Sequence, residues 1–118
     1  MKKHLTSKTE LIVALDFPRA DRAMELVKKL GHASVLFKVG SELFLSGGPD
    51  FVRELVHQKK RVFLDLKLHD IPNTVAKAAR QAAMLHVEMM TVHLAGGSAM
   101  IRAVADELSS IPELKPKI

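Results

Sequence analysis

The chain has 118 residues, of which 47% are hydrophobic and 26% are charged, a composition that suits one globular domain and excludes a disordered chain. The net charge is +5, but the basic residues are dispersed and the chain has no Trp or Tyr, which argues against nucleic-acid binding and leaves open a site for a small anionic substrate. The absence of cysteine, of a membrane-length apolar run and of a signal peptide excludes a disulfide framework and favours a cytoplasmic protein without membrane contact.

Apolar runs and amphipathic stretches alternate along the chain with short connections. The apolar runs predict strands over residues 11–16, 34–39, 62–68 and 87–94. The amphipathic stretches predict helices over residues 20–30, 49–58, 72–86 and 98–108, with a helical turn over 41–45, a break at 47–49 and Ser98 as the N-cap of the last helix. Residues 117–118 look like the first step of another strand.

This alternation of strand and helix predicts parallel strands with right-handed crossovers. Four such units amount to half of a (β/α)8 barrel of the TIM type, and a complete open sheet of four strands is the competing fold. The polar residues Asp16, Lys38 and Asp65 end or interrupt three of the predicted strands. We favour the barrel, because these polar groups would converge at its mouth.

The most unusual stretch carries Asp65, Lys67 and Asp70 within six residues, directly before Ile71 and Pro72. Charges in a buried strand are costly unless they are paired. Because residues i and i+2 of a strand share a face, we expect Asp65 and Lys67 to lie side by side. With Asp70 in the following loop, the stretch predicts an array of carboxylate, ammonium and carboxylate at the C-terminal end of a strand.

Three further residues are candidates for the same site. Lys38 interrupts an apolar strand and needs an anionic partner, for which Asp65 and Asp16 are the natural choices. His93 ends the fourth predicted strand and is a candidate for substrate, supporting or interface contacts, whereas we expect His69 to face solvent. The other histidines have no metal-ligand spacing with any carboxylate, so we expect no metal site. We also expect no cofactor.

The motifs resemble those of orotidine 5′-phosphate decarboxylases. The resemblance rests on the motifs Ala14-Leu15-Asp16, Phe37-Lys38-Val39-Gly40, Phe63 to Thr74, and Val92-His93 with Gly96-Gly97. It implies that residues 11–118 are the N-terminal half of a (β/α)8 decarboxylase barrel and that residues 1–10 are an N-terminal extension. It also implies conversion of orotidine 5′-phosphate to uridine 5′-phosphate (UMP), in pyrimidine biosynthesis and without a metal.

The resemblance further implies a role for each motif residue. Lys67 would protonate C6 of the pyrimidine, and Asp65 would lie beside the substrate carboxylate. Lys38 would hold the array in register and contact the ribose, and Asp16 would bind a ribose hydroxyl. The substrate-binding residues Asp70, Ile71 and Thr74 would reach the site of a partner subunit in a homodimer. Asp70 and Lys38 complete the catalytic set with Lys67 and Asp65.

Two departures from the family pattern and two alternative readings accompany the resemblance. The family's barrel has eight strands and its later loops bind the phosphate, so we expect this segment alone to have little decarboxylase activity, and a catalytically incompetent half-barrel is an alternative. Magnesium-dependent hexulose-phosphate synthases share the Asp-x-Lys-x-x-Asp motif but have an acidic residue where Lys38 stands, which makes them the second alternative. His86 occupies a position where family members usually have glycine, so it is expected to adopt a positive φ.

Overall fold

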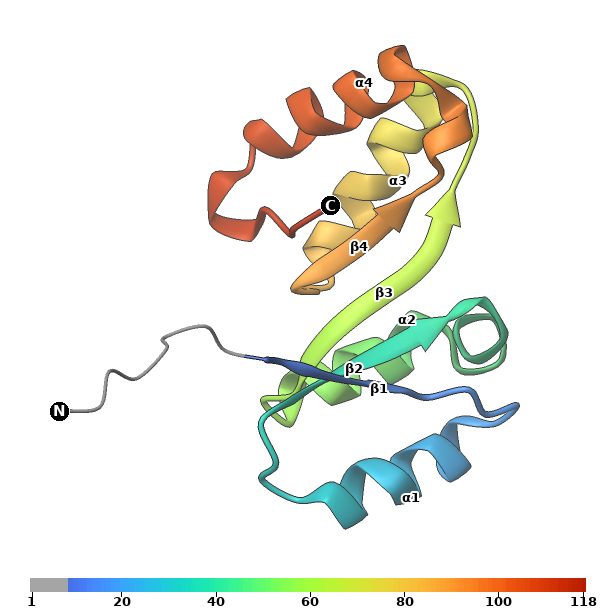
Figure 1. Ribbon diagram of the computed structural model, residues 1–118, viewed down its shortest axis with the longest axis vertical. Coiled ribbons are helices and arrows are strands. Elements are labelled where there is room, and N and C mark those ends of the chain that lie inside the picture. The colour runs from blue at the N-terminus through green and yellow to red at the C-terminus, as the bar shows by residue number, and fades with distance from the viewer. Residues whose placement is uncertain (1–8) are drawn as a thin grey trace, which may run out of the picture.

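The chain folds as four strand–helix units in a row (Figure 1). The structure is a computed structural model that describes residues 9–118. The predicted extension over residues 1–10 therefore lies outside the described residues, apart from Thr9 and Glu10.

The order of elements is the one that the sequence predicts. The strands are β1 (Leu11–Ala14), β2 (Val35–Gly40), β3 (Arg61–Leu68) and β4 (Met89–Val92). The helices are α1 (Ala20–Leu30), α2 (Ser41–His57), α3 (Pro72–Met84) and α4 (Ser98–Ser109), with 3₁₀ turns η1 (Leu94–Gly96) and η2 (Pro112–Leu114). The first and last strands are shorter than predicted. Strand β1 ends two residues early, at Ala14, and β4 starts two residues late, at Met89, and ends at Val92, shortly before the chain turns into η1.

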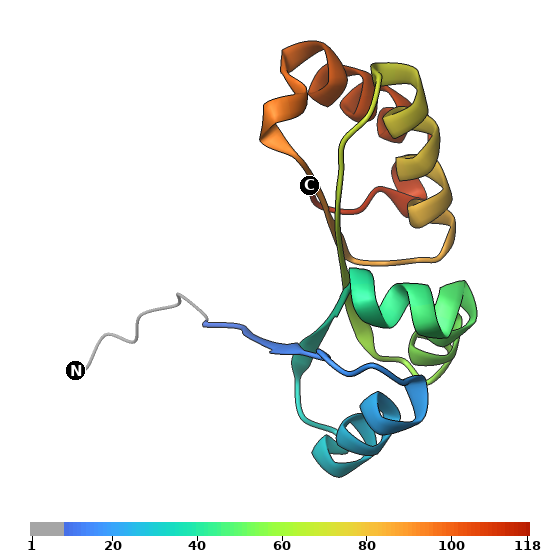
Figure 2. The same ribbon diagram turned by 90° about the vertical axis from the view of Figure 1, so that its right-hand side faces the viewer.

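All strands of the sheet are parallel and follow one another in chain order, β1-β2-β3-β4. The connections between neighbouring strands share one handedness and all step in the same direction along the sheet. Their helices therefore lie on one face of the sheet, as Figure 2 shows. A doubly wound open sheet would instead reverse its strand order at a switch point. Beyond β4, Lys117 forms a parallel bridge with Met89, which confirms the predicted start of another strand.

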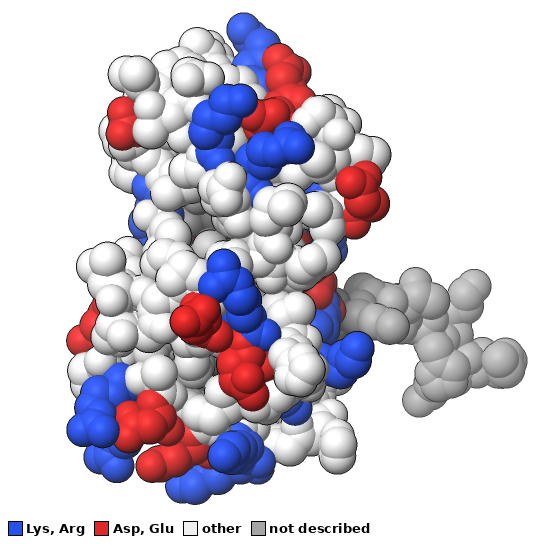
Figure 3. Space-filling view, turned by 180° about the vertical axis from the view of Figure 1, so that it is seen from behind, with Lys and Arg blue, Asp and Glu red and all other residues white. Residues whose placement is uncertain are grey.

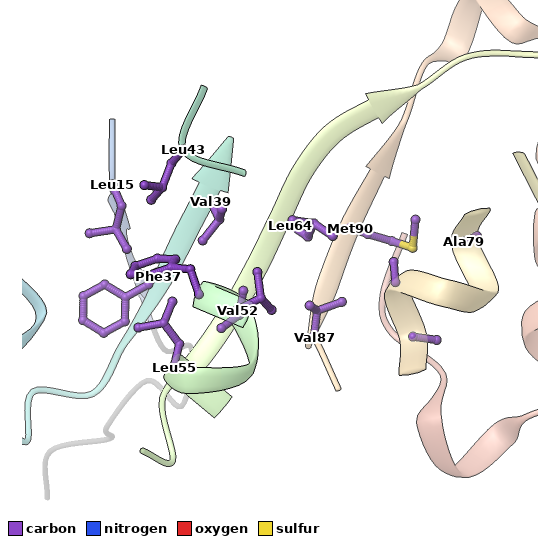
Figure 4. Packing of buried hydrophobic residues seen from close by; sticks show 14 of the residues in the cluster. Leu15, Phe37, Val39, Leu43, Val52, Leu55, Leu64, Ala79, Val87 and Met90 are labelled. Atoms are coloured by element: carbon purple, nitrogen blue, oxygen red, sulfur yellow. The ribbon is translucent and has the colours of Figure 1, made fainter. Parts of the chain in front are cut away.

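The hydrophobic core lies between the sheet and the helices, on both sides of β3 (Figure 4). Phe37 from β2 packs in the part that α1 and α2 cover, and Met90 from β4 packs in the part that α3 covers. Leu64 from the central strand lies between the two parts and is 2% exposed. Strand β3 thus joins both parts of the core and also carries the densest group of charged residues.

Charged side chains of both signs are interspersed over the face opposite to that of Figure 1, as Figure 3 shows. Within residues 9–118, no helix is both long and apolar enough to cross a membrane.

Glycine residues determine the kink in α2 and the start of α4. The predicted break at residues 47–49 appears as a kink inside α2, where Gly48 is non-helical with φ 67° and ψ −175°. This backbone conformation is essentially restricted to glycine. The predicted N-cap Ser98 was wrong: Ser98 is the first helical residue, and Gly97, with φ 90°, occupies the N-cap position.

The prediction for His86 is confirmed, because its φ is 62°. It directly follows Leu85, the residue that caps α3, in the left-handed position where helices commonly end with glycine. A residue with a Cβ atom costs about 1 kcal/mol there.

An ion cluster ties the strands together at their N-terminal ends. Arg61 at the start of β3 binds Glu88, just before β4, through two hydrogen bonds of 2.7 and 2.6 Å. It also pairs with Glu10, just before β1, at 2.8 Å. The hydrogen bonds from Arg61 outweigh the effect of partial burial and lower the pKa of Glu88. The guanidinium of Arg61 therefore links β3 to the residues just before β1 and β4.

The Glu88→Gln substitution should lower the free energy of unfolding by about 1–2 kcal/mol at neutral pH, because a charge-assisted pair is lost. A carboxyl group with a lowered folded-state pKa stabilises the fold above its unfolded pKa of about 4.3, and this stabilisation is lost as pH falls through the folded-state value. The difference between wild type and variant should therefore shrink as the pH falls below about 4.3, the unfolded-state pKa of a glutamate. Urea unfolding at several pH values checks this, with the exposed Glu113→Gln as control. A difference independent of pH would contradict the role of the Glu88 charge.

Candidate active site

Four charged side chains converge at the C-terminal ends of β1, β2 and β3. The Lys67 Nζ lies 2.9 Å from Asp65 Oδ2, which confirms that these two residues lie side by side. The Lys38 Nζ lies 3.7 Å from the same Asp65 oxygen and 3.5 Å from Asp16 Oδ1. Lys38 therefore has both of its predicted partners, and the charges alternate in the order Asp16, Lys38, Asp65, Lys67.

These side chains differ in their contact with solvent. The side chain of Asp65 is 11% exposed and that of Lys38 is 24% exposed, whereas Lys67 and Asp16 are 64% and 69% exposed. Asp65 is thus the inner anchor of the array. The Lys67 ammonium is at the open side, where a bound molecule can reach it.

Competing influences act on the carboxyl group of Asp65. Partial burial is the largest and raises its pKa, but hydrogen bonds from Lys67 and Thr91, together with the charges of Lys67 and Lys38, outweigh it and hold the pKa below the usual value. Asp65 is therefore a carboxylate at neutral pH.

Thr91 belongs to the site, although the sequence analysis did not single it out. Its hydroxyl donates a hydrogen bond of 2.7 Å to Asp65 Oδ1 and accepts one of 3.0 Å from the backbone N–H of Lys67. The available signal was a hydroxyl residue inside an apolar strand, two positions before His93 and so on the same face.

The backbone of Lys67 is in the left-handed region, with φ 50°. The pairing of β3 with β4 shifts register in this region, because Leu64 pairs with Met90 but Leu68 pairs with Val92. Two steps along β4 thus match four steps along β3. Such irregularities bend a strand and re-aim its side chains, and they recur next to active sites.

The other predicted site residues lie outside the array. Asp70 forms no ion pair with Lys67 among residues 9–118, so the predicted third charge is not part of the array in a single chain; its carboxylate instead accepts a hydrogen bond from the Ile71 N–H at 2.7 Å. Asp70, Ile71 and Thr74 are exposed, and Ile71 is 67% exposed. Backbone geometry explains this, because the chain leaves the strand after Leu68 and enters α3 at Pro72.

Two histidines flank the array. His69 is exposed, as predicted, but it stacks on His93 with ring centroids 4.8 Å apart. The Nδ1 atom of His93 accepts a hydrogen bond from the Ala95 N–H at 3.1 Å. The pair joins the loop after β3 to the turn after β4.

The site offers an exposed ammonium for proton donation or anion binding and a desolvated carboxylate that fixes its position. The positive charge of Lys38 occupies the space between the carboxylates of Asp16 and Asp65. Among residues 9–118 there is no cluster of three or more acidic, histidine or cysteine side chains that could hold a metal ion.

Comparison with known proteins places this arrangement in a family. Residues 9–114 match the model of the orotidine 5′-phosphate decarboxylase / HUMPS family. The chain is 54% identical over 107 residues to an orotidine 5′-phosphate decarboxylase of Legionella pneumophila (strain Corby), covering 91% of this chain and 47% of that protein. It is 45% identical over 105 residues to one of Nitrosococcus oceani, covering 89% of this chain and 45% of that protein.

A solved structure of the same family has a similar fold. The crystal structure of orotidine 5′-phosphate decarboxylase from Lactobacillus acidophilus matches with a TM-score of 0.81 and 42% identity, covering 87% of this chain and 46% of that one. The chain thus spans about half the length of the relatives it matches. It supplies the first four βα units of a TIM-type barrel, as the sequence predicts. The chain belongs to the orotidine 5′-phosphate decarboxylase / HUMPS family.

Proposed function

We propose that the protein containing this chain decarboxylates orotidine 5′-phosphate to UMP, within pyrimidine biosynthesis and in the cytoplasm. The observation that carries the proposal is the exposed ammonium of Lys67, held 2.9 Å from the desolvated carboxylate of Asp65. An ammonium at a fixed position can both stabilise a developing carbanion and protonate it.

In the proposed step, the bond between C6 of the pyrimidine and its carboxylate breaks and carbon dioxide leaves. The electron pair stays on C6 and takes a proton from Lys67 Nζ, which gives UMP. Because Lys67 is 64% exposed in the structure, water can return the proton afterwards. The positive charge of Lys67 acts more strongly once the substrate has excluded water from the site.

The remaining residues of the array bind and orient. Asp65 would lie near the leaving carboxylate, Lys38 would contact the ribose while fixing Asp65, and Asp16 would accept a hydrogen bond from a ribose hydroxyl. The exposure of Asp16, at 69%, supports a role in substrate contact. The small separations within the array support Lys38 as the residue that holds the two carboxylates in register.

The proposed reaction uses no metal or other cofactor. Lys38 supports this, because its ammonium lies between Asp16 and Asp65, where a divalent cation would otherwise bind both carboxylates. The second candidate is a magnesium-dependent hexulose-phosphate synthase type of activity, which the Asp-x-Lys-x-x-Asp motif shares. An acidic residue at position 38 would favour that candidate, and lysine disfavours it.

We further propose that the protein is a homodimer in which Asp70, Ile71 and Thr74 contact the substrate site of the partner. The exposure of all three residues at the mouth of the site supports this, and the 67% exposed Ile71 is an apolar side chain that an interface would cover. Nucleic acid and membrane are not among the proposed partners.

The test is an absorbance assay in which the full-length protein converts orotidine 5′-phosphate, run with and without EDTA. We expect turnover that EDTA leaves unchanged. Activity that appears only after magnesium is added would favour the synthase type, and no conversion under either condition would refute the decarboxylase proposal. The 118-residue segment assayed alongside should show little activity, because binding energy from remote parts of a substrate contributes to the rate at its reacting end.

A further inference from the structure

We propose that Thr91 is a positioning residue of the site: its single hydroxyl fixes the Asp65 carboxylate and the Lys67 backbone relative to each other and thereby aims the Lys67 ammonium. Thr91 lies in β4, carries no charge and, among the described residues, forms no hydrogen bond with Lys67 Nζ. The proposal deepens the proposed function and rests on it for the kinetic prediction alone.

The direction of both hydrogen bonds follows from their chemistry. The backbone N–H of Lys67 can only donate, so the Thr91 oxygen is the acceptor of that 3.0 Å bond. The hydroxyl proton of Thr91 is then free for Asp65 Oδ1, 2.7 Å away, and a carboxylate can only accept it. One side chain thus satisfies a backbone donor and a carboxylate oxygen of the same strand.

The bond to Lys67 N–H compensates for the irregular pairing of β3 and β4. A regular strand would direct this N–H to a carbonyl of its neighbour, but the register shifts between Leu64 and Leu68. The Thr91 side chain takes the place of that carbonyl. It thereby stabilises the left-handed backbone of Lys67, which is costly for a residue with a Cβ atom.

The bond to Asp65 completes the environment of its carboxylate. Oδ2 faces the ammonium of Lys67 from its own strand and that of Lys38 from β2, while Asp16, two residues after β1, faces Lys38 from the other side. Oδ1 is held by Thr91 from β4. With both oxygens engaged, the Asp65 carboxylate is held in one orientation, with Oδ2 toward the Lys67 ammonium.

The Thr91→Val substitution keeps the shape of the side chain and removes the hydroxyl. We expect kcat for orotidine 5′-phosphate in the full-length protein to fall about 10- to 100-fold with a smaller change in KM, because a charge-assisted hydrogen bond and the alignment that it provides are lost. Thr91→Ser, which keeps the hydroxyl, should recover most of the activity. Thr9→Val, before β1, is the matched control for the substitution itself.

A second readout separates positioning from general stability and needs no turnover. Titration of the Asp65 side-chain carboxyl carbon by NMR should show a higher pKa in Thr91→Val than in wild type, because the hydroxyl is one of the groups that lower this pKa. In Thr91→Ser, the pKa of Asp65 should stay close to that of wild type. Should Thr91→Val fail to fold, Thr91→Ala provides the same comparison.

The outcomes separate the two proposals. A wild-type protein without decarboxylase activity refutes the proposed function, and the Asp65 titration still tests the role of Thr91. If wild type is active, equal kcat and equal Asp65 pKa in wild type and Thr91→Val would overturn the positioning role. A loss of activity that Thr91→Ser does not recover would also overturn it.

Discussion

Replacing Lys67 by alanine in the full-length protein should lower kcat/KM for orotidine 5′-phosphate by about a thousandfold or more. General acid catalysis contributes about 10²- to 10⁴-fold, and the electrostatic stabilisation by the ammonium is lost with it. The free energy of unfolding should change little, because the Lys67 side chain is 64% exposed. The absorbance assay measures the rate, and circular dichroism with urea unfolding verifies the fold.

Lys67→Arg distinguishes the two contributions of Lys67. Arginine keeps the positive charge but does not release its proton in proteins, so this variant should stay nearly as inactive as Lys67→Ala. Lys29→Ala, in the last turn of α1, is the control for loss of a surface charge. Near wild-type activity of Lys67→Arg would contradict the role of Lys67 as proton donor while leaving an electrostatic role possible.

Replacing Phe37 by alanine should destabilise the protein by about 3–5 kcal/mol, the usual cost of truncating a buried aromatic side chain. Phe37 is 1% exposed and is the largest of the fully buried side chains among the described residues. It lies in the core part that also contains Leu15 and Leu55 (Figure 4). Because domains are stable by only about 5–15 kcal/mol, a large share of the folding free energy depends on this residue.

Urea unfolding measures the effect, with Leu45→Ala as the matched control because Leu45 is 84% exposed. We expect the control to shift the free energy of unfolding by less than about 0.5 kcal/mol. A comparably small effect of Phe37→Ala would contradict the packing of β2 against α1 and α2.

Much of the fold and the centre of the site follow from local sequence rules. The period of two along a strand predicts that Asp65 and Lys67 lie side by side, and the cost of an unpaired buried charge predicts that Lys38 contacts Asp16 and Asp65. The structure has all of these contacts. The element order was predictable for the same reason, because apolar runs and amphipathic stretches were well separated.

What could not be predicted depends on register and backbone detail. The contact of Thr91 with Asp65 requires the register shift between β3 and β4, which involves residues more than twenty positions apart and has no local signal. The same holds for the stacking of His69 on His93. The N-cap of α4 was assigned to Ser98 by residue type, whereas the positive φ of Gly97 places that residue at the cap.

The strand order has a consequence for how the protein is made. Leu11 pairs with Val35, Leu36 with Arg61, and Phe63 with Met89, so each pairing joins residues only about 25 positions apart. A nascent chain leaving the ribosome can therefore add one strand–helix unit at a time to those already formed, without waiting for its C-terminal end. The charged array would be assembled in the order of synthesis, and Thr91, which fixes Asp65 and Lys67, would arrive last.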